Sequence, residues 1–381
     1  MLTLRVVVDQ ILAPVPGGIG RYTEELTRQL IQVAPRGCDV EGVVAAHPQE
    51  EYDRLEDKLP GLAGLYRSVL GRRELSVAWQ TGVIGLPGRG MVHGTSLMTP
   101  LYKHDRSLDA ATQTAVTIHD TVPWTHPSTL TAQGVRWHRA MTKRAYRFAD
   151  AVVVPTHAVA AELNEIFPFG DRIRVIGGAV STELDAPDEA IAARIADELD
   201  LPERYVLSVG TLEPRKGLEP LLQAMAHPDA PDVPLLIVGP EGWGDVHIDD
   251  VVARLGLPQG RVRILGRVSD EALSVLLQRA SVFVFPSVAE GFGLPVIEAF
   301  SFGTPVVHSD APALVEVAAG AGITVPRDDA AGYPERLAQA MFQVVNDLEL
   351  ATRLGVAGLD RARAFSWRDS AEKVWQLHAD L

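Results

Sequence analysis

Two alternating patterns run along most of this chain. Short runs of consecutive apolar residues, rich in Val and Ile, are typical of strands that are buried on both faces of a parallel sheet. Stretches with apolar residues at helical spacing follow many of them, so the alternation predicts doubly wound α/β structure. The expected strands of the first half are Leu4 to Asp9, Val40 to Ala46, Met91 to His93, Ala115 to His119, Ala151 to Pro155 and Arg174 to Ile176.

The pattern breaks between about residues 177 and 190, where GGAVSTELDAPDEA has the composition of a connector, and then begins again. The last segment, FSWRDSAEKVWQLHADL, predicts an amphipathic helix with Ser366 as its N-cap. We therefore expect two domains, residues 1–180 and 181–364, with a final helix at about 365–381 that packs back toward the first. The expected strands of the second half are Tyr205 to Gly210, Leu235 to Gly239, Val262 to Leu265, Val282 to Pro286, Pro305 to Ser309 and Gly322 to Val325.

Composition excludes several classes of protein. With 381 residues, of which 46% are hydrophobic and 22% charged, the chain is neither disordered nor collagen-like. It contains no window near the roughly 18 apolar residues that a membrane span needs. The N-terminus predicts a strand and loop rather than a signal peptide. Cys38 is alone, which rules out an intramolecular disulfide and fits a reducing cytoplasm.

The net charge of −14 argues against nucleic acid as the main partner, but it is unevenly spread. Residues 1–180 hold 19 basic and 18 acidic side chains, which leaves 16 basic and 31 acidic for the rest of the chain. The first half is therefore near neutral at +1, and the second carries −15. This asymmetry predicts two units with different surroundings.

The segment VFVFPSVAEGFGLPVIEAFSFGTPVV in the second half combines several features of a phosphate site. A buried strand ends at Pro286, a glycine-bearing loop follows, and Pro295 suits the first turn of a helix. The backbone N–H groups of Gly293 and Leu294 would then point out of the helix N-terminus, where they and the helix dipole favour a phosphate.

Two carboxylates, Glu290 and Glu298, flank this expected phosphate site. A carboxylate beside a phosphate is repulsive unless it accepts hydrogen bonds, so sugar and ribose hydroxyls are its natural partners. For Glu298 alone, a favourable interaction with the helix dipole is the commoner explanation. The combination with Glu290 and GFGLP favours a ligand.

The segment VLSVGTLEPRKGLEPLL places Arg215 and Lys216 in a turn before another helix. Positive charge at a helix N-terminus opposes the helix dipole unless an anion is also present. Arg supplies a bidentate fork and Lys a point charge, which together suit a diphosphate. A solvated surface pair is the alternative.

In the first half, Gly17, Gly18 and Gly20 lie between the first strand and the first helix, where backbone can approach a phosphate or sugar closely. Thr23 breaks the GxGxxG pattern, so a dinucleotide site is weakly supported and a plain glycine turn is the alternative.

His119 ends a strand at the edge where open α/β sheets bind ligands. This position is as consistent with a ligand contact as with a structural role.

A basic stretch in the first half is consistent with two roles. It is either a solvated face or a surface for anionic lipid, to which each basic residue contributes about 1 kcal/mol. The residues are Arg136, Arg139, Lys143, Arg144 and Arg147, with Arg67, Arg72 and Arg73 nearer the N-terminus.

Together these motifs resemble glycosyltransferase family 4, which has the GT-B fold, and most resemble its bacterial polysaccharide mannosyltransferases. The segments GGIGRYTEEL, IHDTVPWTHP, VGTLEPRKGLEPLL, LGRVSDEAL and FPSVAEGFGLPVIEAFSFGTPVVHSD appear in the family's order across nearly the whole chain. The resemblance implies two Rossmann-like domains that face each other across a cleft. The N-terminal domain would bind the acceptor and the C-terminal domain the nucleotide-sugar donor.

The resemblance also implies a role for each candidate residue. His119 and Glu290 would contact the transferred sugar, and His119 would also line the acceptor side. The family has Arg where Thr211 stands here, so Arg215 beside Lys216 would take over that phosphate contact. The implied donor-binding residues are Gly18, Arg215, Lys216, Gly293 and Leu294 for the diphosphate and Glu298 for the ribose.

The implied reaction is transfer of a sugar from a nucleotide diphosphate sugar, with retention of configuration and with no metal or other cofactor. The acceptor would be a glycan or a lipid-linked sugar of the cell surface, reached at the inner face of the membrane. Mannose from GDP-mannose is the first expectation, and UDP- or dTDP-linked sugars are alternatives. A nucleotide-sugar epimerase or a non-catalytic sensor of the same architecture would share the motifs.

Overall fold

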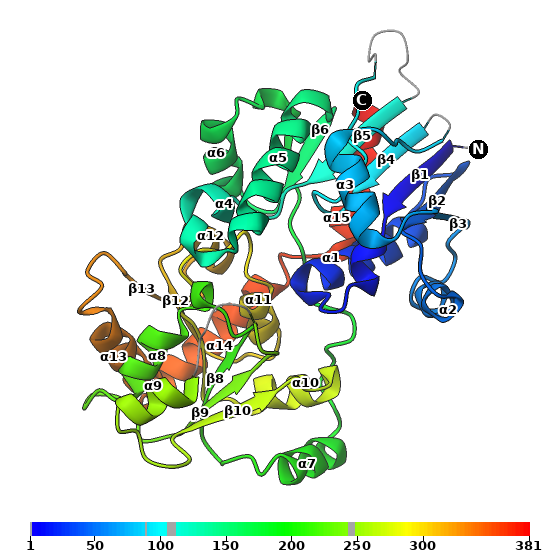
Figure 1. Cartoon of the computed structure of the whole chain (residues 1–381). Coiled ribbons are helices and arrows are strands. Elements are labelled where there is room, and N and C mark those ends of the chain that lie inside the picture. Colours follow the sequence, from blue (N-terminus) through cyan, green and yellow to red (C-terminus); the bar gives the residue numbers. More distant parts are fainter. Residues whose placement is uncertain (1, 88–89, 105–111, 243–247) are drawn as a thin grey trace. The chain divides into compact units, whose positions relative to one another are not determined.

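The computed structural model describes residues 2–87, 90–104, 112–242 and 248–381 (Figure 1). The chain forms two compact units, one of Met1–Gly178 with Ser366–Leu381 and one of Ala179–Phe365. Each unit is built on a parallel sheet with helices on both faces, so the expected α/β class is confirmed. No helix in the described ranges is long and apolar enough to cross a membrane.

The described part of the first unit contains a seven-stranded sheet in the order β3-β2-β1-β4-β5-β6-β7. Its inner strands are buried on both faces, as the continuous apolar runs predict; in β6, for example, Val152, Val153 and Val154 are fully buried. The strands are β1 (Leu2–Val7), β2 (Cys38–Val44), β3 (Gly64–Arg67), β4 (Gly90–Gly94), β5 (Thr112–Thr117), β6 (Ala151–Val154) and β7 (Ile173–Val175).

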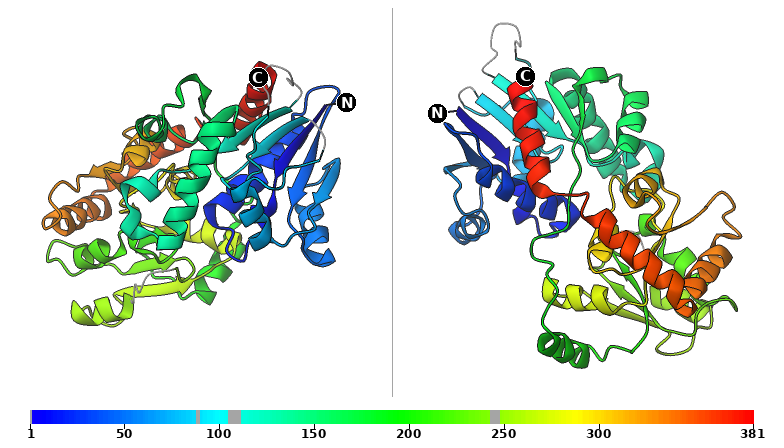
Figure 2. Two further views of the ribbon diagram at one scale, coloured as in Figure 1. Left: turned by 45° about the horizontal axis from the view of Figure 1, so that its top comes forward. Right: turned by 180° about the vertical axis from the view of Figure 1, so that it is seen from behind.

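The final helix belongs to this unit, as predicted. Ser366 caps it by accepting a hydrogen bond from the Asp369 N–H, and Trp375 Nε1 donates to the Leu30 carbonyl of α1 at 3.1 Å. Figure 2 shows this helix, α15, in red beside the strands of the first unit. The α-helices are α1 (Gly17–Gln32), α2 (Gln49–Lys58), α3 (Arg72–Thr81), α4 (Val122–Thr125), α5 (Ala132–Phe148), α6 (His157–Ile166) and α15 (Trp367–Asp380), and the short 3-10 turns are η1 (Asp9–Leu12), η2 (Pro127–Thr129) and η3 (Gly170–Arg172).

Several predicted boundaries in the first unit are wrong. Asp9 lies in η1 and His119 lies two residues beyond the end of β5, so both belong to the loops that follow strands. Strand β3 was not expected, because GLYR is too short to show a pattern.

The described part of the second unit contains a six-stranded sheet in the order β10-β9-β8-β11-β12-β13. Alternate residues of its central strand enter two separate cores: Phe283 and Phe285 face one, and Val282 and Val284 face the other. The strands are β8 (Val206–Val209), β9 (Leu235–Val238), β10 (Val262–Gly266), β11 (Val282–Phe285), β12 (Val306–Ser309) and β13 (Ile323–Val325). The helices are α7 (Glu189–Glu198), η4 (Pro214–Lys216), α8 (Leu218–Met225), α9 (Ile248–Arg254), α10 (Asp270–Arg279), α11 (Leu294–Ser301), α12 (Pro312–Ala318), α13 (Tyr333–Asn346) and α14 (Leu348–Ala362).

Each sheet has one place where the strand order reverses. In the first unit the reversal lies between β1 and β4, and in the second between β8 and β11. Loops leaving the carboxyl ends of such a strand pair diverge to opposite faces, which leaves room for a ligand between them. The fold therefore marks one candidate ligand position in each unit.

Candidate functional site

The two charged motifs of the second unit flank its strand reversal. Arg215 and Lys216 lie in η4, the first helical turn after β8, and Glu290 lies in the loop after β11. Gly293 and Leu294 begin the helix that follows that loop, so strand order brings two motifs distant in sequence to the same edge.

Backbone contacts hold these two loops together. The Val288 N–H donates to the Arg215 carbonyl at 2.8 Å, and the Arg215 guanidinium donates to the Ala289 carbonyl at 2.8 Å. Gly217 has φ +67°, and a Cβ there would lie only 2.2 Å from the Pro286 carbonyl oxygen. Glycine is therefore required for the close approach of the loops.

The approach produces a compact ionic cluster. Glu290 pairs through Oε1 with Lys216 Nζ at 2.6 Å and through Oε2 with Arg215 at 2.9 Å. Arg215 also pairs with Glu213 at 2.7 Å. The Lys216, Arg215 and Glu290 side chains are only 14%, 17% and 10% exposed, so their charges are poorly screened by water.

Burial and charge act in opposite directions on the acidic member of the cluster. Burial raises the pKa of Glu290, but Arg215 and Lys216 outweigh it and lower the pKa to about 2. Burial lowers the pKa of Lys216 despite the opposing charge of Glu290. Glu290 is therefore ionised at neutral pH. Its carboxylate can form an ion pair with a cation or accept a hydrogen bond from a hydroxyl.

Helix α11 begins beside this cluster with a backbone turn that only glycine fits. Gly293 has φ +101°, and a Cβ there would lie 2.5 Å from Leu314 Cδ2. Within the described residues no side chain caps this N-terminus, and Pro295 lies in the first turn as predicted. Glu298 is 2% exposed on the same helix. The geometry is that of a helix N-terminus open to an anion.

In the first unit, the expected glycine loop is instead the start of a helix. Gly17 has φ +58° and begins α1, which places the exposed Gly18 in its first turn. Gly20 is buried against Pro16, to whose carbonyl Gln10 Nε2 donates at 3.3 Å. The expectation of a loop is wrong because α1 begins directly after Pro16, although Gly18 still lies at a helix N-terminus.

His119 lies in the loop after β5 with a defined tautomer. Its Nε2 is 2.8 Å from the Thr95 carbonyl, and since a carbonyl only accepts, Nε2 carries the proton. Nδ1 is then the acceptor of the neutral ring. Burial lowers the pKa of His119, while the Thr95 carbonyl and Asp120 oppose it. The Tyr22 ring lies nearly perpendicular to the His119 ring, with the two centroids 4.8 Å apart.

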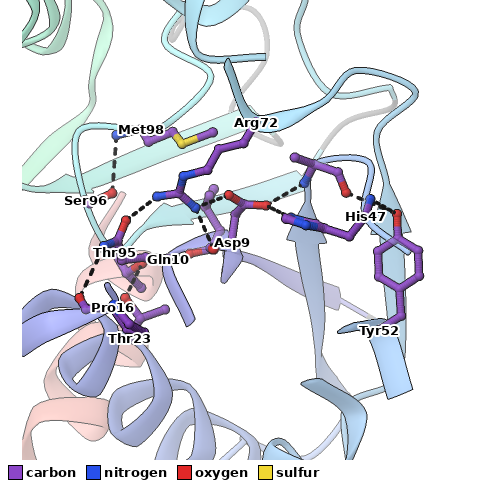
Figure 3. A network of polar contacts seen from close by, with 12 residues as sticks. Asp9, Gln10, Pro16, Thr23, His47, Tyr52, Arg72, Thr95, Ser96 and Met98 are labelled. Carbon is purple, nitrogen blue, oxygen red and sulfur yellow. Dashed lines mark hydrogen bonds and ion pairs between the residues drawn. The ribbon is translucent and has the colours of Figure 1, made fainter. Parts of the chain in front are cut away.

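The sequence patterns did not reveal a polar network at the same edge of the first sheet (Figure 3). Buried Asp9 accepts hydrogen bonds from the Ala45 N–H and from His47 Nε2, both at 2.8 Å. Arg72 donates to the Asp9 carboxylate and to Gln10 Oε1. Arg72 therefore does not belong to the basic surface, because Asp9 and Gln10 hold its guanidinium. A charged residue directly after the first strand was the available signal.

Other members of the basic stretch also differ from expectation. Arg144 is half-buried and donates to the Leu101 carbonyl. Arg67 lies 4.2 Å above the Tyr52 ring and pairs with Glu56. The basic residues of α5 that remain exposed are Arg136, Arg139, Lys143 and Arg147, of which Arg139 also donates to the Pro123 carbonyl.

Two parallel-sheet Rossmann-like units, each with a candidate ligand position at its strand reversal, are the architecture of GT-B glycosyltransferases. The model described as "Glycosyltransferase Family 4" matches residues 16–184, and the model "Glycosyl transferases group 1" matches residues 192–360. The chain belongs to glycosyltransferase family 4.

Curated relatives agree on the class but differ in activity. O-antigen chain mannosyltransferase B of Escherichia coli is 32% identical over 66% of this chain and 66% of its own length. Alpha-maltose-1-phosphate synthase of Mycolicibacterium smegmatis is 28% identical over 95% of both chains. The chain thus spans about two-thirds of the first relative and nearly all of the second.

Solved structures share the fold. Anabaena HepE, in complex with UDP-glucose, superposes with a TM-score of 0.76 at 18% identity and covers 100% of both chains. At that identity the likeness establishes the GT-B fold and leaves the roles of individual residues as predictions.

Proposed function

We propose that this glycosyltransferase transfers a sugar from a nucleotide diphosphate sugar to a hydroxyl, with retention of configuration and without a metal ion. The observation that carries the proposal is the gathering of Arg215, Lys216 and Glu290 beside the N-terminus of α11. The second unit is then the donor-binding domain, and the first unit binds the acceptor.

Arg215 and Lys216 have the chemistry to bind a diphosphate. Their charges and the first N–H groups of α11, including those of Gly293 and Leu294, would stabilise the negative charge that develops on the departing nucleotide. In this role they supply the positive charge that a metal ion supplies at other phosphate sites. Glu298, on the same helix, would accept hydrogen bonds from the ribose.

Glu290 and His119 would orient the transferred sugar. As an ionised carboxylate, Glu290 accepts hydrogen bonds from sugar hydroxyls once a diphosphate shares its two cations. Nδ1 of neutral His119 is a further acceptor, and Gly18 would approach the donor phosphate through backbone. We assign no enzymic nucleophile, and the proton of the incoming hydroxyl would pass to the departing phosphate.

GDP-mannose is the donor we propose first, for a glycan or lipid-linked acceptor of a cell-surface polysaccharide or glycolipid. The mannosyltransferase relative supports mannose, and HepE, solved with UDP-glucose, keeps UDP-sugars as the alternative. A site at the cytoplasmic face of a membrane would suit the exposed Arg136, Lys143 and Arg147 of α5, which attract anionic lipid.

The test is incubation of the full chain with nucleotide sugars, with and without glycan acceptors, followed by NMR of the products. The proposal expects an acceptor-dependent product with the donor's anomeric configuration. Conversion of the donor without an acceptor would instead indicate an epimerase, and binding without turnover a sensor. Lys216→Ala and Glu290→Ala should each abolish transfer while the chain stays folded, and full activity in both would overturn the site.

A further inference from the structure

A row of three rings connects the first residue of α15 to His119. The Trp367 and Tyr22 rings meet edge to face, with centroids 5.6 Å apart and planes at 67°. Tyr22 in turn meets His119 at 4.8 Å and 88°. Tyr22 and Trp367 are each only 4% exposed. Since such edge-to-face pairs have preferred geometry, each ring restricts the orientation of the next.

Helix α1 supports His119 from a second side. The Thr95 carbonyl, which accepts from His119 Nε2, belongs to a residue that is itself fixed. Thr95 Oγ1 donates to the Val7 carbonyl at 2.7 Å, and Thr23 Oγ1 lies 3.0 Å from Thr95 Oγ1 (Figure 3). Tyr22 and Thr23 are neighbours in α1, so one turn of this helix contacts the His119 ring and supports its hydrogen-bond acceptor.

Trp367, at the other end of the row of rings, lies close in sequence to a boundary between the two units. The chain leaves the first unit between Gly178 and Ala179 and returns to it between Phe365 and Ser366. Ser370 Oγ donates to the Gly177 carbonyl at 2.8 Å, one residue before the chain leaves the first unit at Gly178. The first turn of α15 also directly follows Ser366, where the chain returns to this unit. Trp367, at the start of that turn, is the residue that touches Tyr22.

We infer that Tyr22 and Trp367 are positioning residues, which fix the orientation of the His119 ring and make it depend on the first turn of α15. The inference rests on the proposed function only for the consequence in transfer. The Tyr22 ring and the Thr95 carbonyl hold the His119 ring in the orientation in which Nε2 donates to that carbonyl. The same orientation fixes the direction in which Nδ1 points. Without the Tyr22 ring, the His119 ring gains space to rotate and water gains access to it.

The test uses the full chain and measures the NMR signals of the His119 ring directly. The ring C–H signals of His119 are assigned by comparison with His119→Gln and are followed by NMR through a pH titration in Tyr22→Leu and Trp367→Leu. Trp375→Leu is the matched control, because Trp375 lies on the same helix and also packs on α1, but contacts Leu30. Tyr22→Phe retains the ring and is the rescue variant.

We expect the His119 signals to shift in Tyr22→Leu and in Trp367→Leu. The His119 pKa should also rise toward its usual range in both variants, because the ring is then less buried. The titratable groups that face the ring in the wild type are Tyr22 and Asp120. Trp375→Leu and Tyr22→Phe should leave the signals and the pKa unchanged. Unchanged signals in Trp367→Leu, or the same change in Trp375→Leu, would overturn the inference.

The kinetics of sugar transfer test the same inference independently of the NMR signals. We expect kcat to fall by about tenfold to a hundredfold in Trp367→Leu, with little change in the donor KM, because misplacement of a contacting group slows the reaction more than it weakens binding. If the His119 signals move but kcat does not, positioning stands and the role proposed for His119 in transfer fails.

Discussion

Lys216 Nζ lies 2.6 Å from Glu290 Oε1, although the two residues are 74 positions apart in the chain. Strand order explains the contact, because β8 and β11 are neighbours and each residue lies in the loop that leaves its strand. The contact also holds two of the 16 basic residues of a half-chain with net charge −15 side by side, at the proposed diphosphate site. A bound diphosphate must share these cations with Glu290.

Removing the charge of Glu290 should therefore separate nucleotide binding from transfer. In Glu290→Gln, Arg215 and Lys216 lose a competing carboxylate, so a nucleoside diphosphate should bind as tightly as to the wild type or more tightly. Transfer should fall by about a hundredfold or more, because an oriented hydrogen bond to the reacting sugar is lost.

Calorimetry with GDP and UDP, beside a transfer assay, checks both parts. Glu213→Gln is the matched control, because Glu213 also pairs with Arg215 and has no proposed contact with the sugar. Weaker nucleotide binding in Glu290→Gln would contradict the assignment of Glu290 to the sugar.

Gly217→Ala should disturb the same site through the backbone. The new Cβ would lie 2.2 Å from the Pro286 carbonyl oxygen at a φ of +67°, so the two loops must move apart. We expect a loss of stability of about 1–3 kcal/mol and weaker nucleotide binding.

Urea unfolding and calorimetry measure these two effects. Gly256→Ala is the control, because Gly256 has φ +65° but nothing within 4 Å of a new Cβ. Equal effects on nucleotide binding in both variants would show that the approach of the loops is unimportant.

The first unit should lose stability in mild acid because burial lowers the pKa of three of its histidines, His93, His119 and His378. Burial lowers the pKa of His93 from 6.5 to about 4, and neither of its ring nitrogens has a hydrogen-bond partner among the described residues. At His93 the unfolded chain then binds more protons between these pH values, so this residue alone should lower stability by about 3 kcal/mol as pH drops from 6.5 through 4.

Urea midpoints measured from pH 7 to pH 4 test this expectation. His93→Leu should reduce the pH dependence by the contribution of this residue, and His227→Gln, at a half-exposed histidine of the second unit, is the control. An unchanged slope in His93→Leu would exclude His93 as a contributor.

The exposed cations of α5 should determine any attraction to anionic membranes. Co-sedimentation with phosphatidylserine vesicles should weaken between 50 and 200 mM salt and be largely lost in a variant with Arg136, Lys143 and Arg147 all changed to Gln. A second variant, with Arg254, Arg353 and Arg363 changed to Gln, removes equal charge from the second unit and should still bind. Salt-independent binding, or equal loss in both variants, would count against this surface.

Much of the fold follows from local pattern. The apolar run before Pro286 predicts β11, and Pro295 and Ser366 mark the starts of helices that the structure contains. These features depend on residues close together in sequence, where periodicity and capping are informative.

The contacts of the candidate site could not be predicted in the same way. The motifs place Lys216 and Glu290 at strand ends, but only strand order brings them within 2.6 Å. Likewise, Asp9 and Arg72 are 63 positions apart, and β3, one of the two strands between them, is too short to recognise. Long-range pairing of polar side chains leaves no periodic signal.

The most direct test of the proposed donor site is to measure by calorimetry how tightly nucleotide sugars bind to the full chain and to its Lys216→Ala variant. We predict that the wild type binds at least one of GDP-mannose, UDP-glucose and a dTDP-sugar, and that Lys216→Ala, still folded, binds it at least tenfold more weakly. A ligand at 100 times its Kd would also stabilise the wild type by about 2.7 kcal/mol. Equal affinity in the two proteins, or binding of no nucleotide sugar by the wild type, would contradict the proposed donor site.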